Sequence, residues 1–123
     1  MEFLLADDNS TIMSILEKMM AKLGLSYRVA RNGKEAVEVY KANPSLCRCI
    51  LMDIAMPVLS GLGAAVMIRQ YERERELQPA IIVGLKPGPF LDPLHPGFDF
   101  NLRKPIRLEH FRAALSSRGI IPG

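Results

Sequence analysis

Soft metal ligands are scarce in this chain of 123 residues, which holds two cysteines and two histidines. Cys47 and Cys49 alternate across one residue, so a strand would turn both toward the same side, and this spacing alone is a weak metal signal. His95 lies in a segment rich in proline and His110 on an expected helix. We therefore expect reduced thiols and ordinary histidines rather than a zinc site or a disulfide framework.

A long block of one charge sign is also missing. The 16 Lys and Arg residues and the 13 Asp and Glu residues leave a formal net charge of +3. The densest cluster, residues 72–76, alternates in sign as a solvated helix end does. No aromatic residues interleave with basic ones to stack bases, so we expect no nucleic-acid partner for this domain.

No apolar run is long enough to cross a membrane, although apolar residues make up 49% of the chain. The first apolar run, residues 2–6, is not preceded by the basic and long apolar regions of a signal peptide. A chain of this size supplies one hydrophobic core. We expect one cytoplasmic domain over residues 1–123, monomeric and without membrane contact.

Short apolar runs alternate with amphipathic segments along the chain. Apolar side chains recur at helical spacing over residues 12–23, and Gly24 supplies a stop. Further helices are expected to open at residues 32–33 and 60–61 and to cover about 108–117, and strands are expected at residues 2–6, 27–30, 49–53, 80–85 and 98–102. Strands that alternate with helices predict a doubly wound α/β fold with a parallel sheet.

Residues 86–97 interrupt this alternation where a helix is due. The segment holds four prolines and two glycines. Each proline inside a helix would lose a hydrogen bond and clash with the preceding turn. We therefore expect a loop with at most one short turn between the last two strands.

The unbroken apolar run of residues 49–52 ends at Asp53 and indicates a strand buried on both faces. A carboxylate at the end of such a strand lies where open α/β sheets bind ligands. Asp7 and Asp8 follow another apolar run, so two parallel strands would bring three carboxylates together. Two carboxylates roughly 4 to 5 Å apart repel each other by about 4 kcal/mol. A bound Mg²⁺ ion would neutralise this repulsion. The alternative is that Asp7 and Asp8 cap the next helix and Asp53 is a turn residue.

The chain resembles the receiver domains of two-component response regulators and hybrid histidine kinases over essentially its whole length. Each shared motif is weak alone, but their order and spacing are highly specific. The motifs are Asp7-Asp8, Asn32-Gly33-Lys34-Glu35-Ala36, Met52-Asp53-Ile54-Ala55-Met56-Pro57, Gly61 and Lys104-Pro105. The resemblance implies a flavodoxin-like, five-stranded parallel sheet in the order 2-1-3-4-5, with a degenerate fourth helix.

The resemblance also implies a metal site and a phosphoacceptor. Asp53 would attack the phosphorus of a partner's phosphohistidine and form an acyl phosphate. Asp8, Asp53 and the backbone carbonyl of Ala55 would hold Mg²⁺, and Asp7 would act largely through water. Lys104 would pair with Asp53 at rest and with a phosphoryl oxygen afterwards.

Pro105, after a cis bond in the family manner, would aim Lys104 at the site. The exposed first turn of the first helix, with Met13 among its residues, and the loops around Pro57 and Pro105 would receive a partner. The implied partners are a histidine kinase core or a histidine phosphotransfer protein. Kinase activity itself would belong to another domain or protein.

Two switch positions depart from the family. Lys86 stands where a Ser or Thr is expected, and Asn101 where an aromatic residue is expected, although Phe100 is its neighbour. We therefore predict that phosphorylation changes the pocket with little propagation to the distal face, and that Lys86 interacts electrostatically with Asp53 or its phosphoryl group. The alternative is that Lys86 points to solvent and Phe100 performs the switch.

The leading hypothesis is a phosphoacceptor domain of a phosphorelay, either stand-alone or part of a hybrid kinase. A second hypothesis is a pseudo-receiver, an interaction module that works without phosphorylation because Lys86 neutralises Asp53 permanently. A third, an aspartyl phosphatase, is disfavoured because Ala55 stands where that class has a second Asp.

Overall fold

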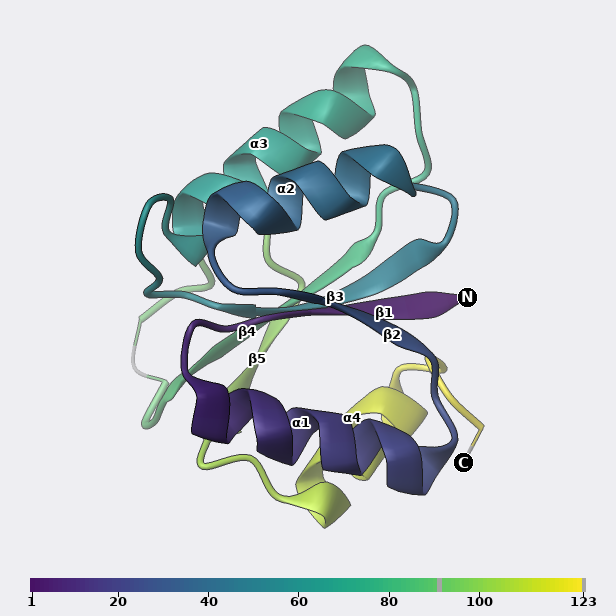
Figure 1. Ribbon diagram of the computed structural model, residues 1–123, viewed down its shortest axis with the longest axis vertical. Helices are drawn as coiled ribbons and strands as arrows, with labels where there is room; N and C mark the ends of the chain where they lie inside the picture. The colour runs from purple at the N-terminus through teal and green to yellow at the C-terminus, as the bar shows by residue number, and fades with distance from the viewer. Residues whose placement is uncertain (91, 123) are drawn as a thin grey trace.

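The computed structural model describes residues 1–90 and 92–122 of the chain. Strands and helices alternate along it, as Figure 1 shows. In chain order the elements are β1 (Glu2–Ala6), α1 (Ser10–Leu23), β2 (Tyr27–Ala30), α2 (Gly33–Ala42), β3 (Cys47–Asp53), α3 (Gly61–Glu74), β4 (Ile81–Pro87), β5 (Phe100–Lys104) and α4 (Leu108–Ser117).

The strands form one parallel sheet in the order β2-β1-β3-β4-β5. Helices α2 and α3 cover one face of the sheet, and α1 and α4 cover the other (Figure 1). The predicted doubly wound fold and strand order are therefore confirmed. Because β1 and β3 are neighbours whose following helices lie on opposite faces, their carboxyl ends form the crevice where such sheets bind ligands.

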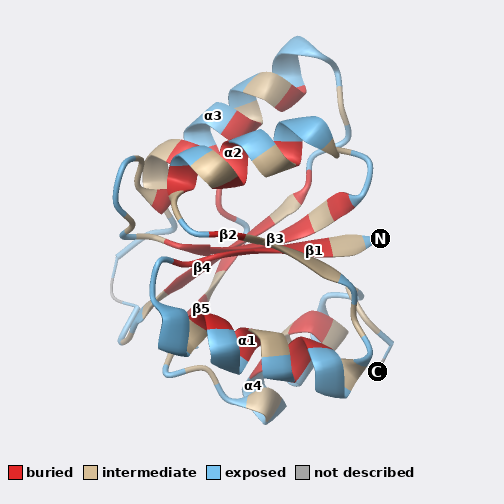
Figure 2. Cartoon of the chain, viewed as in Figure 1, coloured by how far each residue is buried: buried red, intermediate tan, exposed pale blue. Residues whose placement is uncertain are grey.

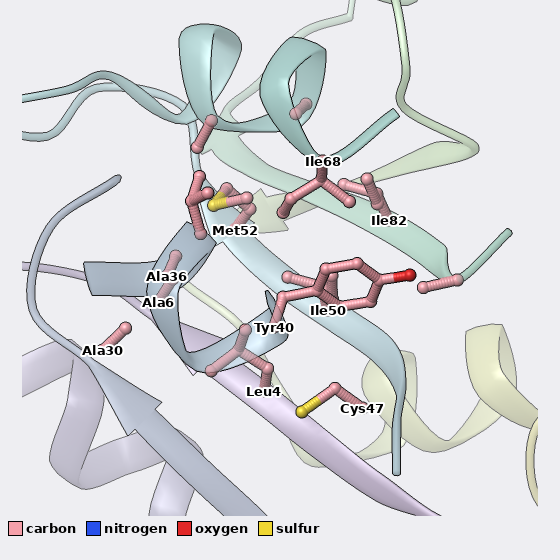
Figure 3. Packing of buried hydrophobic residues seen from close by; sticks show 14 of the residues in the cluster. Leu4, Ala6, Ala30, Ala36, Tyr40, Cys47, Ile50, Met52, Ile68 and Ile82 are labelled. Atoms are coloured by element: carbon pink, nitrogen blue, oxygen red, sulfur yellow. The ribbon is translucent and has the colours of Figure 1, made fainter. Parts of the chain in front are cut away.

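Two hydrophobic layers pack against the sheet, with buried residues along the strands and on the sheet-facing sides of the helices (Figure 2). We call them the α2/α3 layer and the α1/α4 layer. Central strand β3 serves both, since Ile50 and Met52 belong to the first and Leu51 to the second. In Figure 3 the ring of Tyr40 lies beside Ile50 in the α2/α3 layer.

Local signals place the helix ends. The Asn9 side chain accepts a hydrogen bond from the backbone N–H of Ile12 (3.0 Å), so Asn9 is the N-cap of α1. Gly24 ends α1 at φ 67°, a conformation that favours glycine. The closing helix α4 has the predicted bounds. Among the described residues no helix is long and apolar enough to cross a membrane.

The prediction that Cys47 and Cys49 face the same side is wrong. The pairing register between β1 and β3 shifts at this point, because Glu2 pairs with Cys47 and Phe3 with Cys49. The extra residue is a bulge that turns Cys47 into the α2/α3 layer and Cys49 into the α1/α4 layer. Both thiols are free and buried, and burial raises the pKa of Cys49 to about 12. Burial also raises the pKa of Cys47, so the fold disfavours the reactive thiolate form of both cysteines.

The connection between β4 and β5, residues 88–99, contains no helix in its described part. Strand β5 begins two residues later than predicted, because Phe98 is not in the strand but packs into the α2/α3 layer. Arg69 of α3 holds this connection. Its guanidinium donates to the Gly97 carbonyl (2.9 Å) and forms an ion pair with Asp99 (3.0 Å).

Glu72 corrects the expectation that residues 72–76 are wholly solvated. Its side chain is 3% exposed and accepts hydrogen bonds from the Tyr40 hydroxyl and the Ala80 N–H, each at 2.7 Å. Arg69 supplies the opposite charge at 2.8 Å. Burial and the carboxylate of Glu72 raise the pKa of Tyr40. This network joins α2, α3 and the start of β4, as a buried carboxylate requires.

Candidate phosphoryl-transfer and metal site

Three carboxylates meet at the carboxyl ends of β1 and β3. Ala6 pairs with Met52, so Asp7, Asp8 and Asp53 follow at neighbouring places, each with one oxygen within 4.8 Å of the other two. The predicted clustering is therefore observed. Asp7 is fully buried, Asp53 is 6% exposed, and Asp8 is exposed.

Lys104 reaches this cluster from the end of β5. Its ammonium Nζ lies 3.1 Å from Oδ1 of Asp53 and 3.3 Å from Oδ2 of Asp7. The peptide bond between Lys104 and Pro105 is cis, as the resemblance implied. Within the described residues Lys104 is the only ion-pair partner of Asp53 and Asp7.

The remaining contacts of the carboxylates come from the backbone. The Ala55 N–H donates to Oδ1 of Asp53 at 3.3 Å, and the Asn9 N–H donates to Oδ1 of Asp7 at 2.9 Å. Oδ2 of Asp7 is buried and accepts no hydrogen bond among the described residues, although it forms an ion pair with the Lys104 ammonium at 3.3 Å. A buried carboxylate oxygen without a hydrogen-bond donor, beside two further carboxylates, suits a hard divalent cation such as Mg²⁺, so these residues fit the metal.

The environment of Asp53 disfavours its charge when no metal is bound. Burial raises the pKa of Asp53 above its ordinary value, and the negative charge of Asp7 adds to the rise, while Lys104 opposes it. The single ammonium therefore does not fully compensate two buried carboxylates. A bound divalent cation would complete the compensation of these negative charges.

Close backbone packing places Asp53 relative to α3. A Cβ atom at Gly61 would lie 2.0 Å from the carbonyl oxygen of Asp53, and the Gly61 N–H donates to the Ile54 carbonyl at 2.8 Å. Only glycine allows the start of α3 to approach β3 this closely. Ser60 accepts from the Gly63 N–H (3.1 Å) and caps the helix.

Lys86 is not brought to Asp53 in this structure. Its ammonium lies 5.6 Å from the ring centroid of Phe90, and the ion pair with Asp53 belongs to Lys104. In the pairing of β4 with β5, Lys86 stands opposite Arg103. The predicted resting interaction between Lys86 and Asp53 is therefore not observed.

Asn101 and Phe100 point to opposite faces of β5. Phe100 is buried in the α1/α4 layer, with the Arg118 guanidinium 3.9 Å from its ring centroid. Asn101 lies over Gly84, where a Cβ atom would be 2.4 Å from its Oδ1. Phe100 is thus held away from the switch position. Its use as a substitute switch finds no support in this packing.

The expectation that Met13 is exposed is wrong, because its side chain is 1% exposed and packs in the α1/α4 layer. Ile15, by contrast, is 40% exposed. Ile12, Ile15, Pro105 and Ile106, together with Lys104, line an apolar cavity of about 260 Å³. The helical spacing predicted over residues 12–23 includes both Ile12, which packs partly buried against the α1/α4 layer, and Ile15, which the structure exposes. A stripe through residues 13, 16 and 20 fits the helical period equally well.

Comparisons with known proteins agree with this geometry. The family model described as response regulator receiver domain matches residues 3–116. The chain is 35% identical over 118 residues to the peroxide stress-activated histidine kinase mak1 of Schizosaccharomyces pombe, covering 92% of this chain and 7% of that protein. It is 35% identical over 125 residues to hybrid signal transduction histidine kinase G of Dictyostelium discoideum, covering 98% and 4%. The chain thus spans less than a tenth of these curated relatives.

Solved structures extend the likeness. The receiver domain of Ssk1, crystallised with the histidine phosphotransfer protein Ypd1 from Saccharomyces cerevisiae, superposes with a TM-score of 0.87 at 29% identity, covering 98% of this chain and 89% of that one. The receiver domain of the sensor histidine kinase PA1611 from Pseudomonas aeruginosa, with magnesium in its active-site cleft, gives 0.82 at 28% identity and covers 94% of each chain.

Proposed function

Because this chain belongs to the response regulator receiver domain family, whose members are components of phosphorelay systems, we propose that Asp53 accepts a phosphoryl group. The observation that carries this proposal is the pairing of a buried acidic cluster with one ammonium: Lys104 lies 3.1 Å from Asp53 and 3.3 Å from Asp7. A carboxylate nucleophile, a neutralising cation and a set of oxygen ligands therefore stand together.

In the transfer, a carboxylate oxygen of Asp53 attacks the phosphorus of a phosphohistidine. The phosphorus–nitrogen bond breaks, the imidazole leaves with the electron pair of that bond, and an acyl phosphate remains on Asp53. The ammonium of Lys104 pairs with the Asp53 carboxylate before transfer and with a phosphoryl oxygen afterwards. Such reactions require mainly alignment and charge neutralisation.

Asp8, Asp53 and the carbonyl of Ala55 would hold Mg²⁺, with Asp7 acting largely through water. When bound, the ion would neutralise the developing charge on the phosphoryl oxygens. The fully buried carboxylate of Asp7, which contacts Lys104, also orients the ammonium toward Asp53.

The apolar cavity formed by Ile12, Ile15, Pro105 and Ile106 supports a docking surface beside Asp53. We propose that a histidine phosphotransfer protein or a histidine kinase core docks there. The complex of Ssk1 with Ypd1 supports this class of partner. Such a contact must be modest and transient, because the partner has to leave after transfer.

A pseudo-receiver finds less support. It was motivated by a permanent neutralisation of Asp53 by Lys86, yet Lys86 contacts Phe90 instead. The groups required for phosphoryl transfer are all present, namely the carboxylates of Asp7, Asp8 and Asp53 and the ammonium of Lys104. A module that only binds other proteins does not need them.

Small phosphodonors test the acceptor. Acetyl phosphate or phosphoramidate with Mg²⁺ should add the mass of one phosphoryl group to the intact protein, and Asp53→Asn should abolish the adduct. No adduct on the wild type, or an equal adduct on the variant, would refute the proposal.

Docking is tested with phosphorylated Ypd1 as the donor. Ile15→Glu should slow transfer while phosphorylation by acetyl phosphate is unchanged, since a charge would enter the apolar cavity without touching Asp53. Met67→Glu is the matched control, because Met67 of α3 is 42% exposed, close to the 40% of Ile15, and lies outside the cavity. Equal slowing by both variants, or none by Ile15→Glu, would place docking elsewhere.

We also propose that phosphorylation changes the pocket with little effect on the distal face. Phe100 faces the α1/α4 layer, Asn101 carries no ring, and no helix covers the described part of residues 88–99. A bound group shifts conformation only through contacts that differ between two states. Beryllofluoride with Mg²⁺ should move the backbone amide resonances around Asp53, and large changes throughout residues 98–115 would contradict this. If Lys86→Ala changes the lifetime of the phosphoryl group on Asp53, Lys86 interacts with that group.

A further inference from the structure

Basic residues gather at the carboxyl end of β5 and the start of α4. Arg103, Arg107 and His110, together with Pro105, line a surface cavity of about 300 Å³, which we call the basic cavity. Arg103 also stands opposite Lys86 in the register of β4 and β5. Arg103, Arg107 and His110 are exposed.

Charged neighbours are few here. Among the described residues, Lys86, Arg103 and Arg107 form no ion pair. Like charges opposite each other on neighbouring strands destabilise a sheet. Glu109 is the one acidic residue between positions 100 and 122. An external anion would therefore supply a partner that the described residues do not provide.

The basic cavity adjoins the apolar cavity beside Asp53. Pro105 lines both cavities, and residues 104–107 run from one to the other. A protein that covers the apolar residues of α1 and Ile106 would therefore also meet Arg103 and Arg107. The two cavities differ in chemistry but belong to one continuous surface.

We propose that the basic cavity receives an acidic segment of the partner protein, whose Asp or Glu side chains flank its apolar docking patch. The position of this contact rests on the docking surface proposed above. Guanidinium groups bind carboxylates through two parallel hydrogen bonds, which suits Arg103 and Arg107. Opposite charges at the edge of an interface raise the association rate and exclude wrong partners.

The size and setting of the cavity favour a peptide over other polyanions. A volume of about 300 Å³ accommodates one or two acidic side chains. A nucleic acid strand would need a longer basic groove with aromatic residues on which bases stack. A membrane surface would need a broad basic face with apolar anchors rather than a pocket.

An octaglutamate peptide, titrated into the isotope-labelled protein without a phosphodonor, tests the proposal. We expect salt-sensitive changes in the amide resonances of residues 103–110. The double variant Arg103→Gln/Arg107→Gln should bind about tenfold more weakly or worse. The double variant Lys22→Gln/Arg112→Gln is the matched control. It also removes two positive charges, both from exposed helical positions outside the basic cavity.

Each other outcome overturns the proposal. Absent changes at residues 103–110, or equal affinities for Arg103→Gln/Arg107→Gln and Lys22→Gln/Arg112→Gln, would show that the cavity does not take carboxylates. Tighter binding of oligothymidylate, or of vesicles containing phosphatidylserine, at the same residues would assign the cavity to another class of partner. Because no phosphodonor is present, failure here would leave phosphorylation of Asp53 untouched.

Discussion

Gly61→Ala offers a sharp test of how the fold positions the phosphoacceptor. The Cβ atom of the alanine would lie 2.0 Å from the carbonyl oxygen of Asp53, 2.9 Å from its carbonyl carbon and 3.0 Å from Cα of Ile54. All three neighbours are backbone atoms, so no side chain can rotate away. Either the start of α3 or the end of β3 must move by about 1.4 Å to bring this contact from 2.0 Å to the ordinary 3.4 Å.

This displacement sets the expected magnitude. Overpacking of a tight site costs about 1 to 3 kcal/mol, and we expect the upper part of that range because the displacement would also strain the 2.8 Å hydrogen bond from Gly61 N–H to the Ile54 carbonyl. A shift of about 1 Å in a reacting group lowers its rate by roughly a hundredfold. Gly61→Ala should therefore lose both stability and phosphorylation of Asp53.

Gly63→Ala is the control in the same helix. Its Cβ atom would meet Cδ1 of Leu59 at 2.7 Å, the far end of a flexible side chain. Replacing a helical glycine by alanine also gains up to about 1 kcal/mol. Urea unfolding would measure stability, and mass spectrometry after acetyl phosphate treatment would measure the rate. If Gly61→Ala were as stable and as rapidly phosphorylated as Gly63→Ala, close approach of α3 would not position Asp53.

Three further predictions concern stability. Asp53→Asn should stabilise the metal-free protein, because the raised pKa of Asp53 means that the fold disfavours its ionised form. The gain in unfolding free energy should be largest at neutral pH and shrink as the pH falls through the folded-state pKa of Asp53. Urea unfolding of both proteins with EDTA at several pH values measures it. A gain that is constant with pH, or a loss, would contradict the reasoning. Val58→Asn should stabilise by about 1 kcal/mol, since this exposed, β-branched residue has φ 70°; an unchanged urea midpoint would contradict it. Tyr40→Phe should lower the unfolding free energy by about 1 to 3 kcal/mol, because it removes a buried hydrogen bond to charged Glu72. The same substitution in a Glu72→Gln background should cost less. Equal costs in the two backgrounds would show that this hydrogen bond is not responsible.

Local signals in the sequence were sufficient for most of the architecture. The bounds of β1, β2 and α4 match the predicted ranges, because apolar periodicity, capping residues and glycine stops act over a few neighbouring positions. Asp53 at the end of a continuously apolar run was enough to locate the crevice. In a parallel sheet, the direction of the chain decides at which edge each strand ends.

The sequence by itself therefore determined the order of elements and the meeting of Asp7, Asp8 and Asp53. Only the tertiary structure decided which side chains face which neighbours. A bulge between β1 and β3 turned Cys47 away from the side of Cys49.

Helix rotation produced a similar difference in α1, where Met13 was buried and Ile15 exposed. Glu72, in a segment of alternating charge, became buried because Tyr40 and Ala80 happened to supply its hydrogen bonds. Lys86 found the Phe90 ring rather than Asp53. In each case the local pattern was compatible with more than one orientation, and the choice depended on contacts from residues distant in the sequence, which periodicity does not encode.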